Sequence, residues 1–245
     1  MKYALLVCAL LTTMLSTAQF SGKIIFEDKM DMHRNLPPEK EELKDMIPQF
    51  TISKWELTYA GDESLYQPSK EADIAAANTN PGGYRPRFGR ENRILYKNLA
   101  EDKMTDSRDF MQKQFLVIGF IPTQKWKIGK NQKSILGYNC LEASCRIDSA
   151  TLLKAWFTPQ IANSNGPSDY QGLPGMIMQV DINDGERTIT ATNVTMENVD
   201  ASVIIAPSKG KVITYEEFEA MRKEKMKELK LQQGGGGPVM YIRHN

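Results

Sequence analysis

The residues best suited to binding a metal ion near the start of the chain are Met30, Met32 and His33. Two thioether sulfurs and an imidazole nitrogen are soft ligands, and such ligands suit copper. Alternating methionines equally suit packing against a core from one edge of a strand, because alternate residues share a face. We favour packing, and a soft-metal site at these three residues stays as an alternative.

Groups that could carry out catalysis are few. The two histidines, His33 and His244, lie near opposite ends of the chain, and a thiol nucleophile at Cys140 or Cys145 would need one of them as its base. The motifs of zinc proteases, serine hydrolases and phosphate-cradling loops are absent from the sequence. Carboxylates are numerous, but no glycosidase pair stands out. The sequence favours a non-enzymatic protein without a cofactor, with an unrecognised hydrolase as an alternative.

The two cysteines after the start of the chain lie five residues apart in one predicted strand, residues 134–147. In an extended strand they would point to opposite faces and lie about 16 Å apart. A disulfide needs Cα atoms within about 7 Å of each other. We therefore expect free thiols and an ordinary apolar core.

The N-terminus has the pattern of an export signal. Lys2 precedes an apolar run from Leu5 to Leu15, and small residues follow to Ala18. The run is short for a membrane span, and no later run is long enough for one. We expect residues 1–18 to be removed and the protein to be exported. The mature chain then has 30 basic and 30 acidic residues, since removal takes one lysine from 31 and no acid. This balance argues against nucleic-acid binding.

Short apolar runs separated by turns predict an antiparallel sheet, because alternating βα units are missing. The fold expected is mainly β (α+β), a curved sheet or half-barrel with a short N-terminal helix and one C-terminal helix. Asp184-Gly185 is a strong hairpin signal, and a bulge is expected near residues 53–54 because the apolar alternation breaks there. The predicted strands are residues 22–27, 50–59, 65–66, 93–98, 114–118, 125–128, 134–147, 152–157, 176–182 and 188–196.

Three segments stand apart from this pattern. Residues 68–92 read as a flexible, Arg-rich surface insertion in which Tyr84 and Phe88 alternate with arginines, and a solvated loop is favoured over base stacking. A capping box begins a helix at Thr214, with Phe218, Met221 and Leu229 as its thin apolar stripe. Gly234–Gly237 form a link to a last apolar segment. The expected division is a signal peptide at 1–18, a β domain at 19–206, and a helix with a Gly-rich tail at 207–245.

Two apolar strands with a long connection, Trp156 to Asp181, organise the rest of the chain. Gly166-Pro167 marks one turn in the connection. Pro174-Gly175 predicts a type II turn, because proline presets φ at the second position and glycine accepts positive φ at the third. Gln171 to Ile177 contains no acid, base, thiol or metal ligand, so we interpret it as architecture.

These residues resemble the signature of the GLPGLI family, here with methionine in the motif Gly-Leu-Pro-Gly-Met-Ile. The positions that carry the resemblance are Trp156, Gly166, Pro167, Gly172, Leu173, Pro174, Gly175 and Ile177. The resemblance implies a secreted protein of a Gram-negative envelope, in the periplasm or at the cell surface, with a β-rich fold similar to lipoprotein carriers and an unassigned function. It brings no catalytic residues.

The function expected from the sequence is that of a non-enzymatic envelope protein. It would bind an apolar ligand or a partner protein on a curved sheet, since amphipathic strands occur without a reactive constellation. It is not expected to be an integral membrane protein or to bind nucleic acid.

Overall fold

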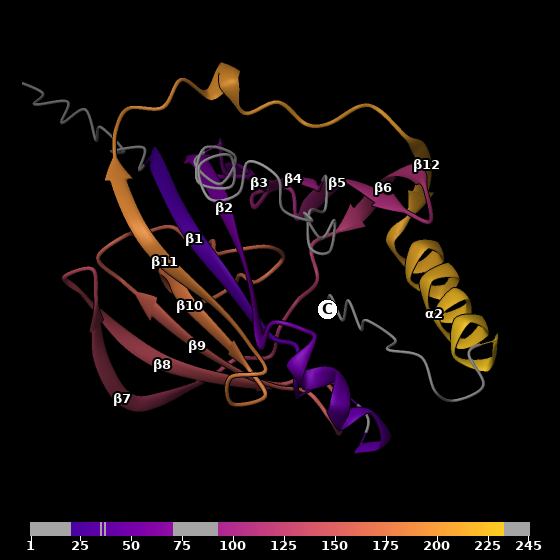
Figure 1. The fold of residues 1–245 in the computed structure, drawn as a ribbon. Helices are drawn as coiled ribbons and strands as arrows, with labels where there is room; N and C mark the ends of the chain where they lie inside the picture. Colours follow the sequence, from indigo (N-terminus) through magenta and orange to yellow (C-terminus); the bar gives the residue numbers. More distant parts are fainter. Residues whose placement is uncertain (1–20, 35, 37, 71–92, 233–245) are drawn as a thin grey trace, which may run out of the picture.

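Twelve strands form one strongly curved sheet that does not close, and one long helix follows it (Figure 1). The computed structural model describes residues 21–34, 36, 38–70 and 93–232. The strand order is β12-β6-β5-β4-β3-β2-β1-β11-β10-β9-β8-β7. The strands are β1 (Ser21–Asp31), β2 (Phe50–Ala60), β3 (Glu63–Pro68), β4 (Ile94–Asn98), β5 (Lys103–Phe110), β6 (Lys113–Phe120), β7 (Lys127–Ile135), β8 (Tyr138–Arg146), β9 (Leu152–Thr158), β10 (Met176–Ile182), β11 (Arg187–Met196) and β12 (Lys211–Thr214).

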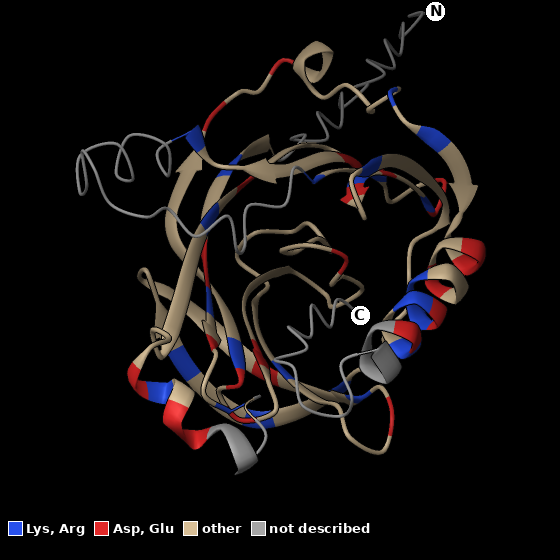
Figure 2. Cartoon of the chain, turned by 45° about the vertical axis from the view of Figure 1, so that its right-hand side comes forward, with Lys and Arg blue, Asp and Glu red and all other residues tan. Residues whose placement is uncertain are grey.

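Nearly all the pairing is antiparallel, as the short turns predicted, and Asn183 and Asp184 take positive φ in the hairpin between β10 and β11. The exception is β12, which returns from the far side of the molecule to pair parallel with β6. The sheet curves round most of a ring, and helix α2 (Tyr215–Gln232) stands at the side that the strands leave open (Figure 2). No helix among the described residues is long and apolar enough to cross a membrane.

The break in alternation within β2 is not a bulge. β2 pairs with β1 in continuous register from Ala60 to Phe50, so the bulge predicted at residues 53–54 is wrong. Ile52 is exposed, whereas Trp55 is buried. The apolar residues of this strand therefore lie on both faces of the sheet, and a single backbone register accounts for the sequence pattern. The irregularity occurs instead between β1 and β11, at Ile25 and Phe26.

The C-terminal helix forms as predicted, whereas the N-terminal helix is of another type. The capping box of α2 is confirmed: Glu217 N–H donates to Thr214 Oγ1 at 3.2 Å, and Thr214 N–H donates to the Glu217 carboxylate at 3.0 Å. Phe218 is buried and Met221 is half-buried, while the side chain of Leu229 lies outside the described residues. The predicted N-terminal helix is a 3-10 helix, η1 (Pro38–Asp45); a second, η2 (Ala201–Val203), follows β11.

The other corrections concern short strands. Residues 134–147 are not one strand, because Leu136 and Gly137 take positive φ and turn the chain between β7 and β8. β5 and β12 were not predicted, since their polar and short patterns lack a clear period of two. The export signal, most of the Arg-rich insertion with Tyr84 and Phe88, and the Gly-rich tail with His244 lie outside the described residues.

Candidate functional site

The connection between β9 and β10, residues 159–175, is buried for most of its length, and we call it the internal segment. Its contacts reach distant parts of the sheet. Asn163 Nδ2 donates to the carbonyl of Gly61, after β2, at 2.7 Å. Trp126 Nε1, before β7, donates to the carbonyl of Gln171 at 2.7 Å. A segment that touches both halves of a curved sheet lies on its concave side, so the chain itself fills this side.

Backbone geometry explains the glycines of the internal segment. Gly175 has φ +145°, and Gly172 has φ +85°, so the positive φ predicted at Gly175 is confirmed. The hydrogen bonding differs from a type II turn. Gly175 N–H donates to the Leu173 carbonyl at 2.7 Å, and Met176 N–H donates to Ile161 at 3.1 Å. The turn is tighter than predicted, because its hydrogen bond joins residues two apart. Strand β10 begins at the next residue, Met176.

Gly175→Ala should destabilise the protein more than Gly172→Ala. Both substitutions place a side chain at positive φ, which costs on the order of 1–2 kcal/mol. A Cβ at Gly175 would also lie 2.2 Å from the Thr158 carbonyl oxygen, whereas a Cβ at Gly172 meets nothing within 4 Å. Urea unfolding of both variants measures the difference, and equal free energies of unfolding would contradict the close contact between the Gly175 turn and β9.

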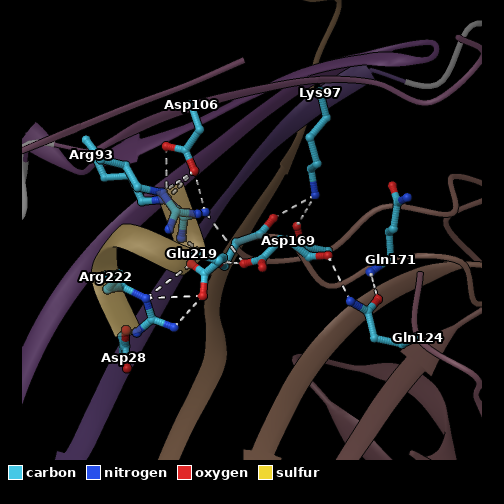
Figure 3. Close-up of polar contacts among 12 residues, drawn as sticks. Asp28, Arg93, Lys97, Asp106, Gln124, Asp169, Gln171, Glu219 and Arg222 are labelled. Carbon is cyan, nitrogen blue, oxygen red and sulfur yellow. Dashed lines mark hydrogen bonds and ion pairs between the residues drawn. The ribbon is translucent and has the colours of Figure 1, made fainter. Parts of the chain in front are cut away.

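Charged side chains converge where the internal segment meets β4 and β5 (Figure 3). Arg93 Nη2 donates to Asp106 Oδ2 at 2.7 Å, and Arg108 Nε donates to the same oxygen at 2.6 Å. Arg93 Nη2 also lies 3.6 Å from Asp169 Oδ1 on the internal segment. We call these residues, together with Lys97, the ion cluster; all five are buried. Lys97 lies on β4, Arg93 immediately precedes β4, Asp106 and Arg108 lie on β5, and Asp169 lies on the internal segment, so the cluster joins the sheet to the segment.

Ser168 links the two sides of the ion cluster. Arg93 Nη1 donates to Ser168 Oγ at 2.6 Å, and this hydroxyl donates to Asp169 Oδ1 at 2.5 Å. Burial by itself raises the pKa of Asp169. The guanidinium groups of Arg93 and Arg108, with the Ser168 hydroxyl, outweigh burial and hold the pKa of this carboxyl below its usual value. Asp169 is therefore ionised at neutral pH and attracts two arginines.

Among the basic members of the ion cluster, Lys97 differs from the two arginines: no carboxylate of the described residues accepts a hydrogen bond from it. Its Nζ donates to the backbone carbonyls of Ser168, at 2.8 Å, and Gly166, at 3.2 Å. Burial is the main cause that lowers the pKa of Lys97 to about 7; Asp169 opposes the shift, and Arg93 adds to it. The internal segment is thus attached to β4 through an amine whose charge is costly.

A second buried ion pair lies farther along the concave side. Arg187 of β11 donates to both oxygens of Asp28 of β1, at 2.8 and 2.5 Å. The pKa of Arg187 is raised because Asp28 outweighs the effect of burial. Tyr66 and Tyr170 lie close enough for this pair and the ion cluster to act on them, and burial raises the pKa of both phenols. These phenols stay neutral at physiological pH and behave as packed aromatic groups.

Helix α2 contacts the sheet next to the ion cluster. Phe218 packs edge-on against Phe110 and Phe115, and the guanidinium carbon of Arg108 lies 5.5 Å from its ring centroid. On the same helix Arg222 donates to Glu219 in a two-pronged ion pair, with Nη2 at 2.6 Å from Oε2 (Figure 3). One buried aromatic side chain, stacked on a cluster arginine, thus fixes the helix at the open side.

The residues predicted as soft-metal ligands are engaged in other contacts. His33 Nε2 bonds the Ile47 carbonyl at 2.8 Å, and the Met32 sulfur accepts from Thr51 Oγ1 at 3.7 Å. Met30 pairs with Thr51 on one side and with Arg187 on the other. Among the described residues, no group of three or more His, Cys, Asp or Glu side chains is placed to hold a metal ion. The packing interpretation and the soft-metal alternative at Met30, Met32 and His33 both stay predictions.

The two cysteines and the residues of the glycine motif lie in different surroundings. Cys140 and Cys145 are free and buried, and burial raises the pKa of the Cys140 thiol, which makes it a poor nucleophile. Trp156 is half-buried beside Lys133, whose ammonium lies 4.3 Å from the ring centroid, and it pairs with Gln179 and Glu142 on a solvent-facing row. The motif residues Gly166, Leu173 and Ile177 lie in the core instead.

The ion cluster was not predicted. Its residues are spread from Arg93 to Asp169, and no spacing rule joins them. One signal was present: Asp106 and Arg108 alternate in a short run, and in a strand alternate residues share a face. A charged pair on one face of a strand predicts that this face is solvated. In the structure Asp106 and Arg108 are buried because the internal segment folds over them. The arrangement holds charges in fixed pairs and supports the backbone.

The fold is a mainly β, curved and unclosed sheet with one C-terminal helix, and comparisons with known proteins add a family match and a likeness in fold. A family model described as a protein of unknown function (Porph_ging) matches residues 144–179, which include β9 and the internal segment. The match is compatible with the resemblance that the glycine motif carries. No curated protein matches this chain.

Solved structures add a distant likeness in fold. Two structures of PNGF-II, in space groups P21 and C2, each have a TM-score of 0.55 and 13% identity, over 82% and 84% of this chain. The chain spans about a third of the length of these proteins, since the match covers 33% of each. A conserved uncharacterised protein from Thermus thermophilus has a TM-score of 0.41 and 4% identity, over 80% of this chain and 91% of that one.

Proposed function

We propose that this chain is a non-enzymatic, exported envelope protein that binds a partner protein on the outward side of its sheet. Of the two ligand classes predicted from the sequence, the apolar small molecule is the less supported. A carrier of the lipoprotein-carrier type needs a concave side that is open and apolar. Here the internal segment fills that side and places Asp169 beside the buried Arg93 and Lys97.

The observation that carries the proposal is an exposed apolar row at one edge of the sheet. Val212 of β12 pairs with Leu116 of β6, and Ile118 and Phe120 follow on the same face of β6, because alternate residues share a face. Phe120 is 70% exposed, Val212 59% and Ile118 40%. Scattered apolar residues are normal on a surface, whereas a contiguous row is typical of a protein interface.

A photo-reactive phenylalanine analogue at position 120 should cross-link to a partner in cells of the native host. The matched control is the same analogue at Met46, which is also strongly exposed but lies in another part of the molecule. We expect a discrete adduct from position 120 and none from position 46. The adduct should disappear when Ile118 and Val212 are both changed to Ser, while the melting temperature changes little, since surface substitutions stay within about 0.5 kcal/mol.

The purified protein and its cross-linking variants also distinguish the proposed function from its alternatives. Protein purified from envelopes without detergent should carry no lipid, because its concave side is filled. Stoichiometric lipid, together with equal adduct yields from positions 120 and 46, would contradict the proposal and support an apolar ligand. The metal alternative would be supported by tight Cu(I) binding that is lost when His33 is changed to Ala and Met30 and Met32 are changed to Leu.

A further inference from the structure

Strands β7 and β12 lie at the two ends of the unclosed sheet (Figure 1). Among the described residues β7 pairs with β8 alone, and β12 pairs with β6 alone. The outer edge of an end strand presents backbone N–H and C=O groups that no other strand of the sheet uses. Such an edge is either protected against further pairing or open to a strand from another protein.

The edge at β7 has two features that protect an end strand. Lysines recur along it, at Lys127, Lys130 and Lys133. Its register with β8 also shifts between Ile128 and Gln132, so the strand contains a bulge. Lysines and bulges at an edge hinder the pairing of a further strand. β7 is therefore the protected end of the sheet.

The edge at β12 has an apolar surface instead. Lys211, Val212 and Thr214 of this strand are exposed, so no other part of the described chain covers them. The exposed row that begins at Phe120 and Ile118 of β6 ends at Val212, on the last strand of the sheet. A strand added beside β12 would therefore continue this row with its own apolar side chains.

The backbone of Val212 directs its hydrogen-bonding groups away from β6. Thr214 N–H donates to the Glu217 carboxylate at 3.0 Å, so β6 is not its partner. The backbone groups of alternate residues in a strand point to the same side, so the N–H and C=O of Val212 face the outer edge too. Lys211 and Ile213 then provide the pairing with β6. Val212 presents one donor and one acceptor to an added strand, beside an exposed apolar side chain.

Lysines gather at the N-terminal end of the β6–β12 pair. Lys211 pairs with Phe115, and Lys113 lies two residues earlier on β6, so both lysines are on the opposite face of the sheet from Val212. Lys209 precedes β12 at the same end, and all three lysines are exposed. An added strand would thus have apolar neighbours on one face and ammonium groups on the other. Alternating apolar and acidic residues complement such a pair of faces.

We propose that the partner protein supplies an extended segment of alternating apolar and acidic residues, which pairs with the outer edge of β12. This mode of binding rests on the proposed function and specifies how the partner is held. Hydrogen bonds to the Val212 backbone provide attachment, and the side chains on the two faces provide specificity. The apolar residues extend the row of Phe120, Ile118 and Val212, and the acidic residues lie towards Lys113 and Lys211.

Two proline substitutions distinguish the outer edge of β12 from its pairing with β6. Val212→Pro removes an N–H that points outward, and proline is tolerated on the solvent side of an edge strand. Ile213→Pro removes an N–H that pairs with β6. The melting temperature should fall by several degrees in Ile213→Pro and change little in Val212→Pro. Equal falls would contradict the assignment of the Val212 N–H to the outer edge.

Cross-linking from the photo-reactive analogue at position 120 tests the added strand in cells of the native host. The adduct yield should be about tenfold lower in Val212→Pro than in Val212→Ala. Both variants lose most of the valine side chain, but only proline removes the outward N–H. Mass spectrometry of the adduct should place the cross-link in a segment of alternating apolar and acidic residues.

A synthetic peptide with the sequence of the cross-linked segment then serves as the probe for the purified full-length protein. Its addition should slow hydrogen exchange of the Val212 amide. Changing Lys113 and Lys209 to Glu should weaken peptide binding by about tenfold at low salt, where charges are least screened. The matched control is Lys130→Glu, at an exposed lysine of β7, which should bind the peptide as the wild type does.

The contrary results separate the added strand from the proposed function. Equal adduct yields in Val212→Pro and Val212→Ala would overturn strand addition and leave the proposed function in place. No adduct from position 120 in the otherwise unchanged protein would remove both. An adduct of two copies of this chain, or of this chain with lipid, would assign the edge of β12 to another occupant and overturn the acidic partner segment.

Discussion

Asp169→Asn will lower the free energy of unfolding by about 3–5 kcal/mol, the usual cost of removing one partner from a buried ion pair. The loss is large because Arg93 and Arg108 then have Asp106 as their remaining carboxylate in the ion cluster, and both arginines are buried. Asparagine keeps the shape and an oxygen for the Ser168 hydroxyl. The change therefore reports on charge, and urea unfolding at pH 7 measures it.

The matched control is Glu101→Gln, which breaks the ion pair with Lys103 at the surface. That pair is shorter than the Arg93–Asp169 pair, at 2.8 Å against 3.6 Å, but both of its side chains are more than half exposed. Exposed pairs contribute no more than about 1 kcal/mol. If Asp169→Asn cost no more than Glu101→Gln, the ion cluster would not be what holds the internal segment to the sheet.

The second large effect is a pH dependence that belongs to Lys97. Its pKa is lowered from 10.5 in the unfolded chain to about 7 in the folded protein. Between these values the unfolded state binds more protons, so stability rises with pH. Below pH 7 the amine is protonated in both states, and the cost of burying it is present in full. The cost is relieved as pH rises from 7 towards 10, by at most about 1.4 kcal/mol per pH unit.

Lys97→Met removes this titration and should flatten the rise. The stability difference between mutant and wild type should be most favourable to the mutant at pH 7 and below, and should shift towards the wild type as pH increases to 10. Chemical unfolding at several pH values and constant ionic strength measures it. Lys103→Met, at an exposed lysine, is the control. Parallel pH curves for the wild type and Lys97→Met would show that the buried amine does not titrate as described.

Local rules found most of the strands but not the residues that fix the concave side. The hairpin at Asp184-Gly185, the capping box at Thr214 and the positive φ of Gly175 depend on neighbours in sequence, so the sequence predicts them. The ion cluster depends on β4, β5 and the internal segment meeting in space. Nothing local distinguishes Asp106 on a strand covered by another segment from an aspartate on a solvated strand.

The same limit applies to the long connection between β9 and β10. Its glycines and prolines predicted turns, and turns usually lie at the surface. Here the segment folds inward. Its apolar residues Ile161, Tyr170 and Leu173 are buried, and its polar groups bind the charged residues of the ion cluster. The interpretation of the motif as architecture stays a prediction, and its place inside the curve of the sheet was not predictable from turn chemistry.

Amide hydrogen exchange of the internal segment tests most directly whether the segment fills the concave side of the sheet. The N–H groups of Gly172, Met176 and Ile177 are hydrogen-bonded to carbonyls within or next to the segment. In the free protein they should be protected as strongly as the amides of the central strand β1. Exchange as fast as in the exposed turn at residues 148–150, with protection gained only when an apolar ligand is added, would contradict a filled concave side and restore the lipid-carrier interpretation.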